Sequence, residues 1–201
     1  MMMRKNPSIA AAMCVLACVA LLSTPAAGQA ADEELVDNPA YQSWQKHKPG
    51  TLVVYDMITA MGAFNMNMEM TQTLAEIDPE KAVVEVTTKM NMPGAPPGAN
   101  PPNQKQTIKA KVPKKEAEMG KLPPGTTGEI KEAGTESVEV AGKSYECKVI
   151  EFKGKNDHGE QTGKVWNTTD IPGGVAKLNS EGQAGGQAMT IKMTVKSIET
   201  K

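Results

Sequence analysis

The chain has 201 residues, of which 22% are charged and only 3% are aromatic, and its formal net charge is −1. Lysines and glutamates alternate along the chain instead of forming blocks, which is typical of a solvated surface and argues against nucleic acid or an anionic membrane surface as a partner. Without its first thirty residues, the chain still has the length of one domain with a substantial core.

Residues 1–30 have the pattern of a cleavable secretory signal peptide. Basic side chains at 4–5 precede an unbroken apolar stretch at 9–22, and Gly28 and Ala30 stand at the −3 and −1 positions of a cleavage site. The apolar stretch is short for a membrane span. We therefore predict a secreted or periplasmic protein with no stable membrane insertion after cleavage, whose mature chain has 20 basic and 23 acidic residues and a net charge of −3.

One cysteine remains in the predicted mature chain. Cys14 and Cys18 lie within the signal peptide, which leaves Cys147 and excludes an internal disulfide. Strand alternation places Tyr145, Cys147 and Val149 on one side. This pattern predicts that Cys147 is a small buried apolar residue and not a nucleophile.

The predicted domain, residues 38–201, begins with a short helix. Residues 31–37 are expected to be a flexible acidic lead-in. Asn38 then has the features of an N-cap, and Pro39 suits the first helical position. Tyr41 and Trp44 are three residues apart and share one face of this helix, so we expect them to pack against the remainder of the domain.

From residue 51 onward the sequence alternates with a period of two, which predicts strands. The turn Asp78–Pro79 separates two clear strands. Residues 93–103 are rich in Pro and Gly and are expected to form a long exposed loop, and 113–125 to contain one helical turn. The inward positions of the two strands are Met66, Met68, Met70 and Leu74, and Val84, Val86, Met90 and Met92.

The C-terminal half continues as strands and turns. We predict a hairpin turn at 141–143, a strand around Trp166, turns at 170–174 and 182–186, and a last strand that carries Met189 and Met193 inward. The sequence thus predicts a mainly β fold, with a single strongly curved antiparallel sheet or partly open barrel of eight to ten strands. A two-sheet sandwich is the alternative.

Motifs of catalysis are missing from the sequence. His47 and His158 are the only histidines, and the chain has no nucleophile elbow, phosphate-binding loop or cluster of zinc-binding spacing. We therefore predict a protein that is not an enzyme, and we assign no catalytic residue, no metal ligand and no cofactor.

Methionines are the most informative side chains, since ten of the fourteen lie beyond the signal peptide. Three interpretations are open. They can be ordinary core, they can line an adaptable apolar cleft, or paired thioethers can bind Cu(I). Copper binding predicts tight Cu(I) affinity that is lost when Met66, Met68 and Met70 are all replaced by Leu.

Short motifs resemble a known group of exported proteins. The segments VEVAGKSYECKV, KVWNTTDIPGGVAKL and NPAYQSWQKHKPGTLVVYDM are similar to exported bacterial proteins with a LolA/LolB-like curved β-sheet, especially uncharacterised families of planctomycete type. The resemblance implies an apolar cavity beneath the methionine-rich face, because LolA-like proteins carry lipid acyl chains inside an unclosed barrel. It transfers no functional residue to this chain.

The first functional hypothesis is a lipid or another apolar small molecule bound in a methionine-rich cleft. The predicted ligand-binding residues are Met66, Met68, Met70, Val84, Val86 and Met90. The second hypothesis is an interaction or structural module of the cell envelope with a fully packed core, in which the loop 93–103 is the contact surface. Cu(I) binding by the methionine stripe is the third.

Overall fold

The computed structural model describes residues 34–91, 100–119, 127–156, 159–184 and 186–201. The predicted signal peptide and most of the loop 93–103 lie outside these residues. The elements in chain order are β1 (Leu35–Asp37), α2 (Pro39–Gln45), β2 (Leu52–Met61), β3 (Phe64–Ile77), β4 (Lys81–Asn91), β5 (Gln104–Lys109), β6 (Lys111–Pro113), α3 (Lys114–Met119), β7 (Thr127–Val140), β8 (Lys143–Asn156), β9 (Gly159–Asn167), β10 (Val175–Ala184) and β11 (Gln187–Glu199).

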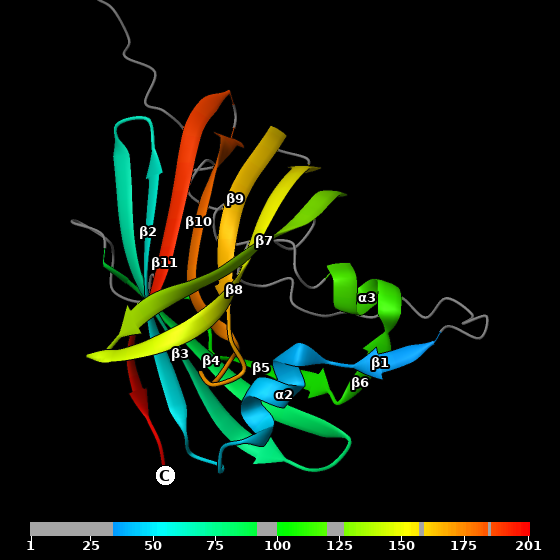
Figure 1. Cartoon of the computed structure of the whole chain (residues 1–201). Coiled ribbons are helices and arrows are strands. Elements are labelled where there is room, and N and C mark those ends of the chain that lie inside the picture. Colours follow the sequence, from blue (N-terminus) through cyan, green and yellow to red (C-terminus); the bar gives the residue numbers. More distant parts are fainter. Residues whose placement is uncertain (1–33, 92–99, 120–126, 157–158, 185) are drawn as a thin grey trace, which may run out of the picture.

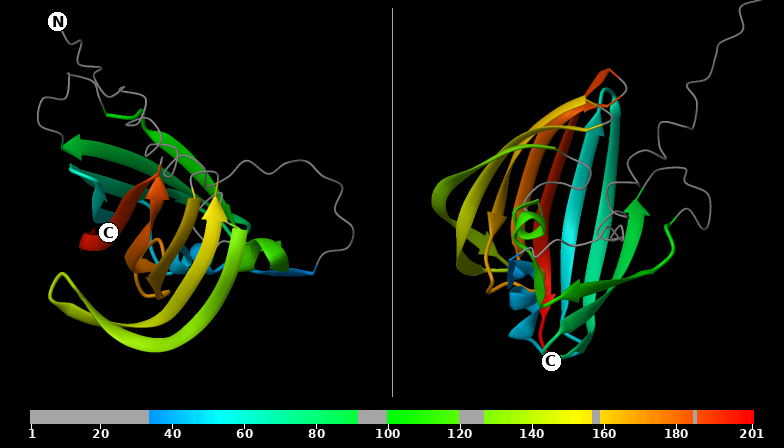
Figure 2. Two further views of the ribbon diagram at one scale, coloured as in Figure 1. Left: turned by 90° about the horizontal axis from the view of Figure 1, so that it is seen from above. Right: turned by 90° about the vertical axis from the view of Figure 1, so that its right-hand side faces the viewer.

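Nine strands form one antiparallel sheet in the order β5-β4-β3-β2-β11-β10-β9-β8-β7. β5 and β7 are its two edges, so the sheet does not close into a barrel. Its strands curve around an open side, as the view from above in Figure 2 shows. The prediction of a strongly curved, mainly β fold is confirmed, and one continuous sheet takes the place of the alternative sandwich.

Helix α2 packs at one end of the open side. The Asn38 side chain accepts a hydrogen bond of 3.0 Å from the Ala40 amide, and Pro39 occupies the first turn, as predicted. Tyr41 and Trp44 are buried, and the Tyr41 hydroxyl donates to the Asp78 carbonyl oxygen at 2.7 Å. The helix contacts β3, β4 and β5, so its aromatic face closes this end of the core.

A small two-stranded sheet lies next to the helix. β1 pairs with β6, in the register Val36 opposite Val112, and α3 follows β6 directly. Residues 35–37 of the predicted lead-in are therefore part of a strand, and the helical turn predicted within 113–125 is α3. Figure 1 shows β1, β6 and α3 projecting beyond the edge of the main sheet.

The β7–β8 hairpin is long and bent. Its turn consists of Ala141 and Gly142, with φ of 50° and 78°, between the paired residues Val140 and Lys143. This is the turn that the sequence predicts. A register shift between Glu132 and Thr135 interrupts the pairing farther along. As a result, β7 also contacts β10 and β11, which are not its hydrogen-bonded neighbours (Figure 1).

The main core joins α2 to the strands on which it lies. One connected cluster includes Trp44 from α2, Tyr55 from β2, Val84 from β4 and Ile171 from the β9–β10 connection. The Tyr55 hydroxyl donates to the Pro172 carbonyl oxygen at 3.3 Å, and burial raises the Tyr55 pKa well above its ordinary value. An exposed ion pair of 2.6 Å between Lys46 and Asp170 ties the helix end to the same connection.

Candidate functional site

A continuous row of apolar side chains crosses seven neighbouring strands on one face of the sheet. Residues that stand directly opposite each other in antiparallel strands point to the same face, so the register defines this set. We call it the apolar row, and it consists of Ile150, Val165, Leu178, Met193, Met57, Met68 and Met90, from β8 to β4.

The apolar row lies on the concave side of the sheet. Tyr55 precedes Met57 by two residues and therefore shares its face of β2. Tyr55 belongs to the core cluster that contains Trp44 of α2, and Figures 1 and 2 show α2 on the concave side. Along β2, the apolar row is therefore the next inward position after the core residue Tyr55, on the side away from α2.

A second row on the same face lies two residues farther along each strand, on the side away from α2. It consists of Phe152, Gly163, Ser180, Ile191, Thr59 and Met66. The two rows are partly open to solvent: Met66, Met68 and Phe152 are buried, whereas Met57 and Ile191 are only half-buried. Apolar atoms in the middle of a concave face therefore remain accessible.

The opposite face of the same strands carries ion pairs. Lys196 contacts Glu69 at 2.7 Å and Asp56 at 3.5 Å, and Lys164 contacts Glu151 at 2.7 Å. The hydrogen bond from Lys196 lowers the Glu69 pKa. At these positions, charge on one face and methionine on the other is the pattern of an antiparallel sheet with one solvated face and one apolar face.

Three polar side chains lie in or next to the second row: Ser180 and Thr59 belong to it, and Gln161 is the next residue on the same face of β9 after Gly163. The Gln161 amide donates to the Ser180 hydroxyl at 2.7 Å, and this hydroxyl donates to the Thr162 carbonyl oxygen at 3.2 Å. The Thr59 hydroxyl is buried and has no hydrogen-bond partner in the described part of the chain. A desolvated hydroxyl without a partner costs free energy.

Replacing Thr59 by Val should stabilise the protein in the absence of ligand, by about 1 kcal/mol, because the variant removes a buried hydroxyl that makes no hydrogen bond. Thr190 is the matched control: it pairs with Ala60 on the opposite face and is only half-buried, so Thr190→Val should change little. Urea denaturation measures both. A loss of stability at Thr59 would show that its hydroxyl is satisfied.

The register divides the predicted ligand-binding residues into two groups. Met68 and Met90 belong to the apolar row, and Met66 belongs to the second row. The other three, Met70, Val84 and Val86, belong to the core cluster together with Trp44. They form the packed floor that the rows adjoin.

Sequence reasoning missed several residues of the rows. Met57 and Leu178 were not predicted, although Met57 follows the inward Tyr55 at a strand interval. Alternation alone identifies a face of each strand, but only the register shows which residues of different strands lie side by side. Met193, which the alternation does place inward, joins the apolar row in this way.

Cys147 is fully buried within the core cluster, as predicted. Burial raises the pKa of its thiol, and the negative charge of Asp170 adds to this effect. Val149 and Trp166 are paired and buried on the same face as Cys147, whereas the next pair, Ile150 and Val165, is buried on the opposite face. Side chains are therefore buried on both faces of β8 and β9 at this level, and the core cluster includes residues from the face opposite the apolar row.

Cys147 should react with Ellman's reagent only when the protein unfolds, since it is inaccessible and its raised pKa disfavours the thiolate. The rate of this reaction should rise by orders of magnitude in about 6 M guanidinium chloride, a concentration that unfolds most proteins. Labelling of the native protein at the rate of a free thiol would contradict this placement.

Other titratable groups do not gather into a site in the described ranges. No three His, Cys, Asp or Glu residues there are placed to hold a metal ion. Burial, and secondly the charge of Lys46, lower the pKa of His47, and its Nε2 atom is buried without a hydrogen-bond partner. His158 lies outside the described residues. Among the helices described, none is long and apolar enough to span a membrane.

No protein-family model and no curated protein matches the chain. Its similarities are to solved structures. A Bacteroides fragilis protein named as exported, with a YmcC-like fold, has 8% identity over 77% of this chain and 97% of its own, at a TM-score of 0.47. The hypothetical lipoprotein YmcC of Escherichia coli has 10% identity over 96% of this chain and 98% of its own, at a TM-score of 0.33. A Vibrio parahaemolyticus domain named for outer-membrane lipoprotein sorting has 8% identity over 81% of this chain and 91% of its own, at a TM-score of 0.29.

Proposed function

We propose that the protein is an exported, non-enzymatic carrier or receptor whose concave face binds the acyl chain of a lipid or a similarly elongated apolar molecule. The observation that carries this proposal is the apolar row, which runs across seven strands and is partly accessible to solvent. Contiguous apolar surface that stays accessible to solvent is typical of an interaction site.

Burial of the ligand supplies the binding free energy. Each methylene that leaves water contributes about 0.8 kcal/mol, so a chain of ten methylenes contributes about 8 kcal/mol against the cost of association. The methionine side chains of the row, from Met57, Met68, Met90 and Met193, are flexible and polarizable, so they adapt to chains of different length and shape. The unpartnered Thr59 hydroxyl offers one hydrogen bond within this apolar face.

A displaceable dansyl-labelled undecanoic acid tests the proposal. The wild-type protein is expected to bind the probe with enhanced, blue-shifted emission and to release it to oleic acid. Met57→Asp should weaken binding by more than about tenfold, because the ligand then desolvates a carboxylate.

Ile58→Asp is the matched control for Met57→Asp. Ile58 is the next residue of β2, lies on the opposite face and is 48% exposed, so the same charge there should leave probe binding unchanged. Thermal unfolding of both variants establishes that they are folded. A wild-type protein that neither binds the probe nor contains a lipid overturns the proposal, as does equal binding by the two variants.

Cu(I) binding is a second candidate function, and the register favours a different set of thioethers from the one that sequence spacing suggests. Met57, Met68 and Met90 stand directly opposite one another on three adjacent strands, whereas Met66 and Met70 are separated from Met68 along β3. Cross-strand neighbours are closer than i, i+2 neighbours on one strand. Competition with a Cu(I) chelator should therefore show loss of binding in Met57/Met68/Met90→Leu but not in Met66/Met70→Leu.

A further inference from the structure

Two neighbouring turns at the end of the sheet away from α2 contain no charged residue. Residues 57–68, which include the β2–β3 turn, lie between Asp56 and Glu69 and carry no charge. Residues 182–191, which include the β10–β11 turn, are likewise uncharged. In a chain with 22% charged residues, two such runs at one place are a feature that needs a physical reason.

The two turns lie side by side. The Gly62 amide donates to the Ala188 carbonyl oxygen at 3.3 Å, and Met61 stands opposite both Phe64 and Met189 in the register. Both views in which the strand ends are visible, in Figures 1 and 2, show the turns together at the same end of the molecule.

Apolar side chains are exposed at these turns. Phe64 is 43% exposed, Ala63 and Ala188 are also exposed, and Met61 and Met189 are half-buried. We call these five residues the uncharged rim. Phe64 therefore leaves a large part of an aromatic ring in contact with water at a hairpin tip.

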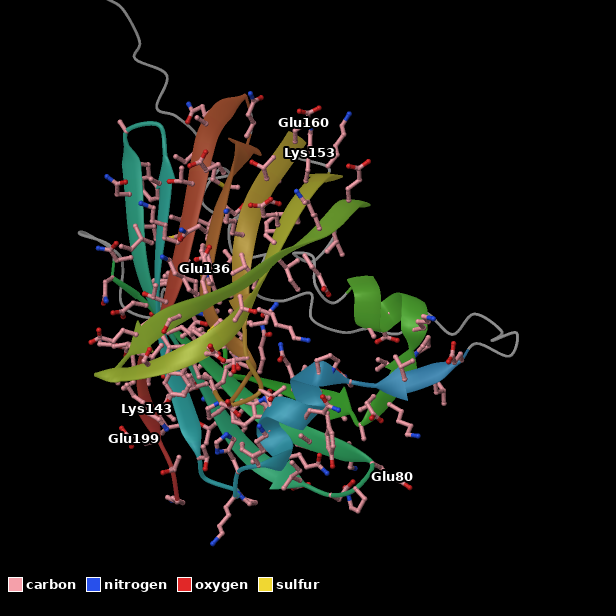
Figure 3. The ribbon with its side chains drawn as sticks, viewed as in Figure 1. Glu80, Glu136, Lys143, Lys153, Glu160 and Glu199 are labelled. Atoms are coloured by element: carbon pink, nitrogen blue, oxygen red, sulfur yellow. The ribbon has the colours of Figure 1, made fainter. Side chains whose placement is uncertain are left out.

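Other turns of the sheet carry charged residues. Figure 3 shows Glu80, Lys143 and Glu199 at the end near α2, on the β3–β4 turn, the β7–β8 turn and the last strand. Lys153 and Glu160 flank the neighbouring β8–β9 turn at the same end as the uncharged rim. Charged residues therefore stand at these other turns, whereas the two turns that carry Phe64 and Met189 have none.

The uncharged rim continues the concave apolar face. Starting from the apolar row, the paired residues on β2 and β3 are Met57 and Met68, then Thr59 and Met66, then Met61 and Phe64. An acyl chain that leaves a bilayer at the rim would meet no charged side chain on this path. This continuity connects the rim to the proposed ligand face.

We propose that the uncharged rim docks on the surface of a phospholipid bilayer, with Phe64 entering the boundary between headgroups and acyl chains. This inference rests on the proposed function, since it names the source from which the ligand is loaded. Entry of the rim desolvates no charge, and the aromatic ring gains contact with the acyl region. The flanking charges at Lys153 and Glu160 would remain in the aqueous headgroup zone.

Vesicle flotation tests the proposal with vesicles of palmitoyl-oleoyl-phosphatidylcholine, which carry no net charge. The wild-type protein is expected to float with the vesicles, and Phe64→Asp should reduce the bound fraction by about tenfold. Ile58→Asp removes another exposed hydrophobic residue of comparable size from a position outside the rim, so it should float like the wild type.

Phe64→Trp provides a direct readout of insertion. The two native tryptophans, Trp44 and Trp166, are buried, so a blue shift of the emission on addition of vesicles, and quenching by brominated phosphatidylcholine, would come from the new side chain. Absence of vesicle binding, equal flotation of Phe64→Asp and the wild type, or binding that requires anionic lipid and disappears in high salt would each overturn the proposal.

Failure of docking and failure of ligand binding are distinguishable. Phe64 is not part of the two rows, so Phe64→Asp is expected to keep the wild-type affinity for dansyl-undecanoic acid in solution while it loses vesicle binding. Conversely, Met57→Asp should lose the probe and still float. A protein that binds the probe but not vesicles refutes only the docking surface.

Discussion

Trp44→Ala should lower the free energy of unfolding by about 3–5 kcal/mol, the range for removal of a large aromatic side chain from a core. Trp44 is fully buried and links α2 to the strand residues of the core cluster. Since the helix has only seven residues, it depends on this contact and not on its own propensity. Chemical denaturation followed by far-ultraviolet circular dichroism measures the loss.

Gln45→Ala is the control for this variant, because Gln45 is the next residue of α2 and is exposed. Its effect should stay within about 0.5 kcal/mol. If both variants had equally small effects, α2 would not be docked on the sheet, and the packed floor of the proposed ligand face would be wrong.

Gly173→Ala should destabilise the protein by about 2–4 kcal/mol, from backbone strain and from steric overlap. Gly173 has a φ of 83°, which L side chains rarely adopt. A Cβ atom there would lie 2.7 Å from the Tyr55 hydroxyl oxygen and 2.8 Å from Oε1 of Gln72. The β9–β10 connection could then no longer pack against Tyr55 and Trp44.

Gly142→Ala separates the two causes. Gly142 has a similar φ of 78°, but a Cβ atom there would meet no other atom within 4 Å. This control should therefore lose only the backbone contribution, about 1 kcal/mol. Equal losses at the two glycines, measured by urea denaturation, would show that the β9–β10 connection yields to the new methyl group.

Local patterns in the sequence predicted the elements that local interactions determine. The Asn38–Pro39 cap, the Ala141–Gly142 turn and the inward face of β3 depend on residues close in sequence, and all three are present in the structure. Burial of Cys147 followed from alternation in the same way.

Contacts between distant segments were not predictable in this way. β1 and β6 are three residues each and pair across more than seventy residues, without a periodic pattern long enough to recognise. The change of buried face between Val149 and Ile150 arises where the sheet is covered on both sides. Likewise, the separation of Met70 from Met68, one in the core beneath α2 and one in the apolar row, depends on where the helix lies.

Native mass spectrometry of the protein purified without detergent tests the central claim most directly. The account predicts a population that carries an additional mass equal to one fatty acid or phospholipid, which collisional activation releases and which Met57→Asp lacks while Ile58→Asp retains it. A spectrum with the protein mass alone, from wild-type protein that also fails to take up added oleic acid, would contradict the claim that the concave face binds an apolar ligand.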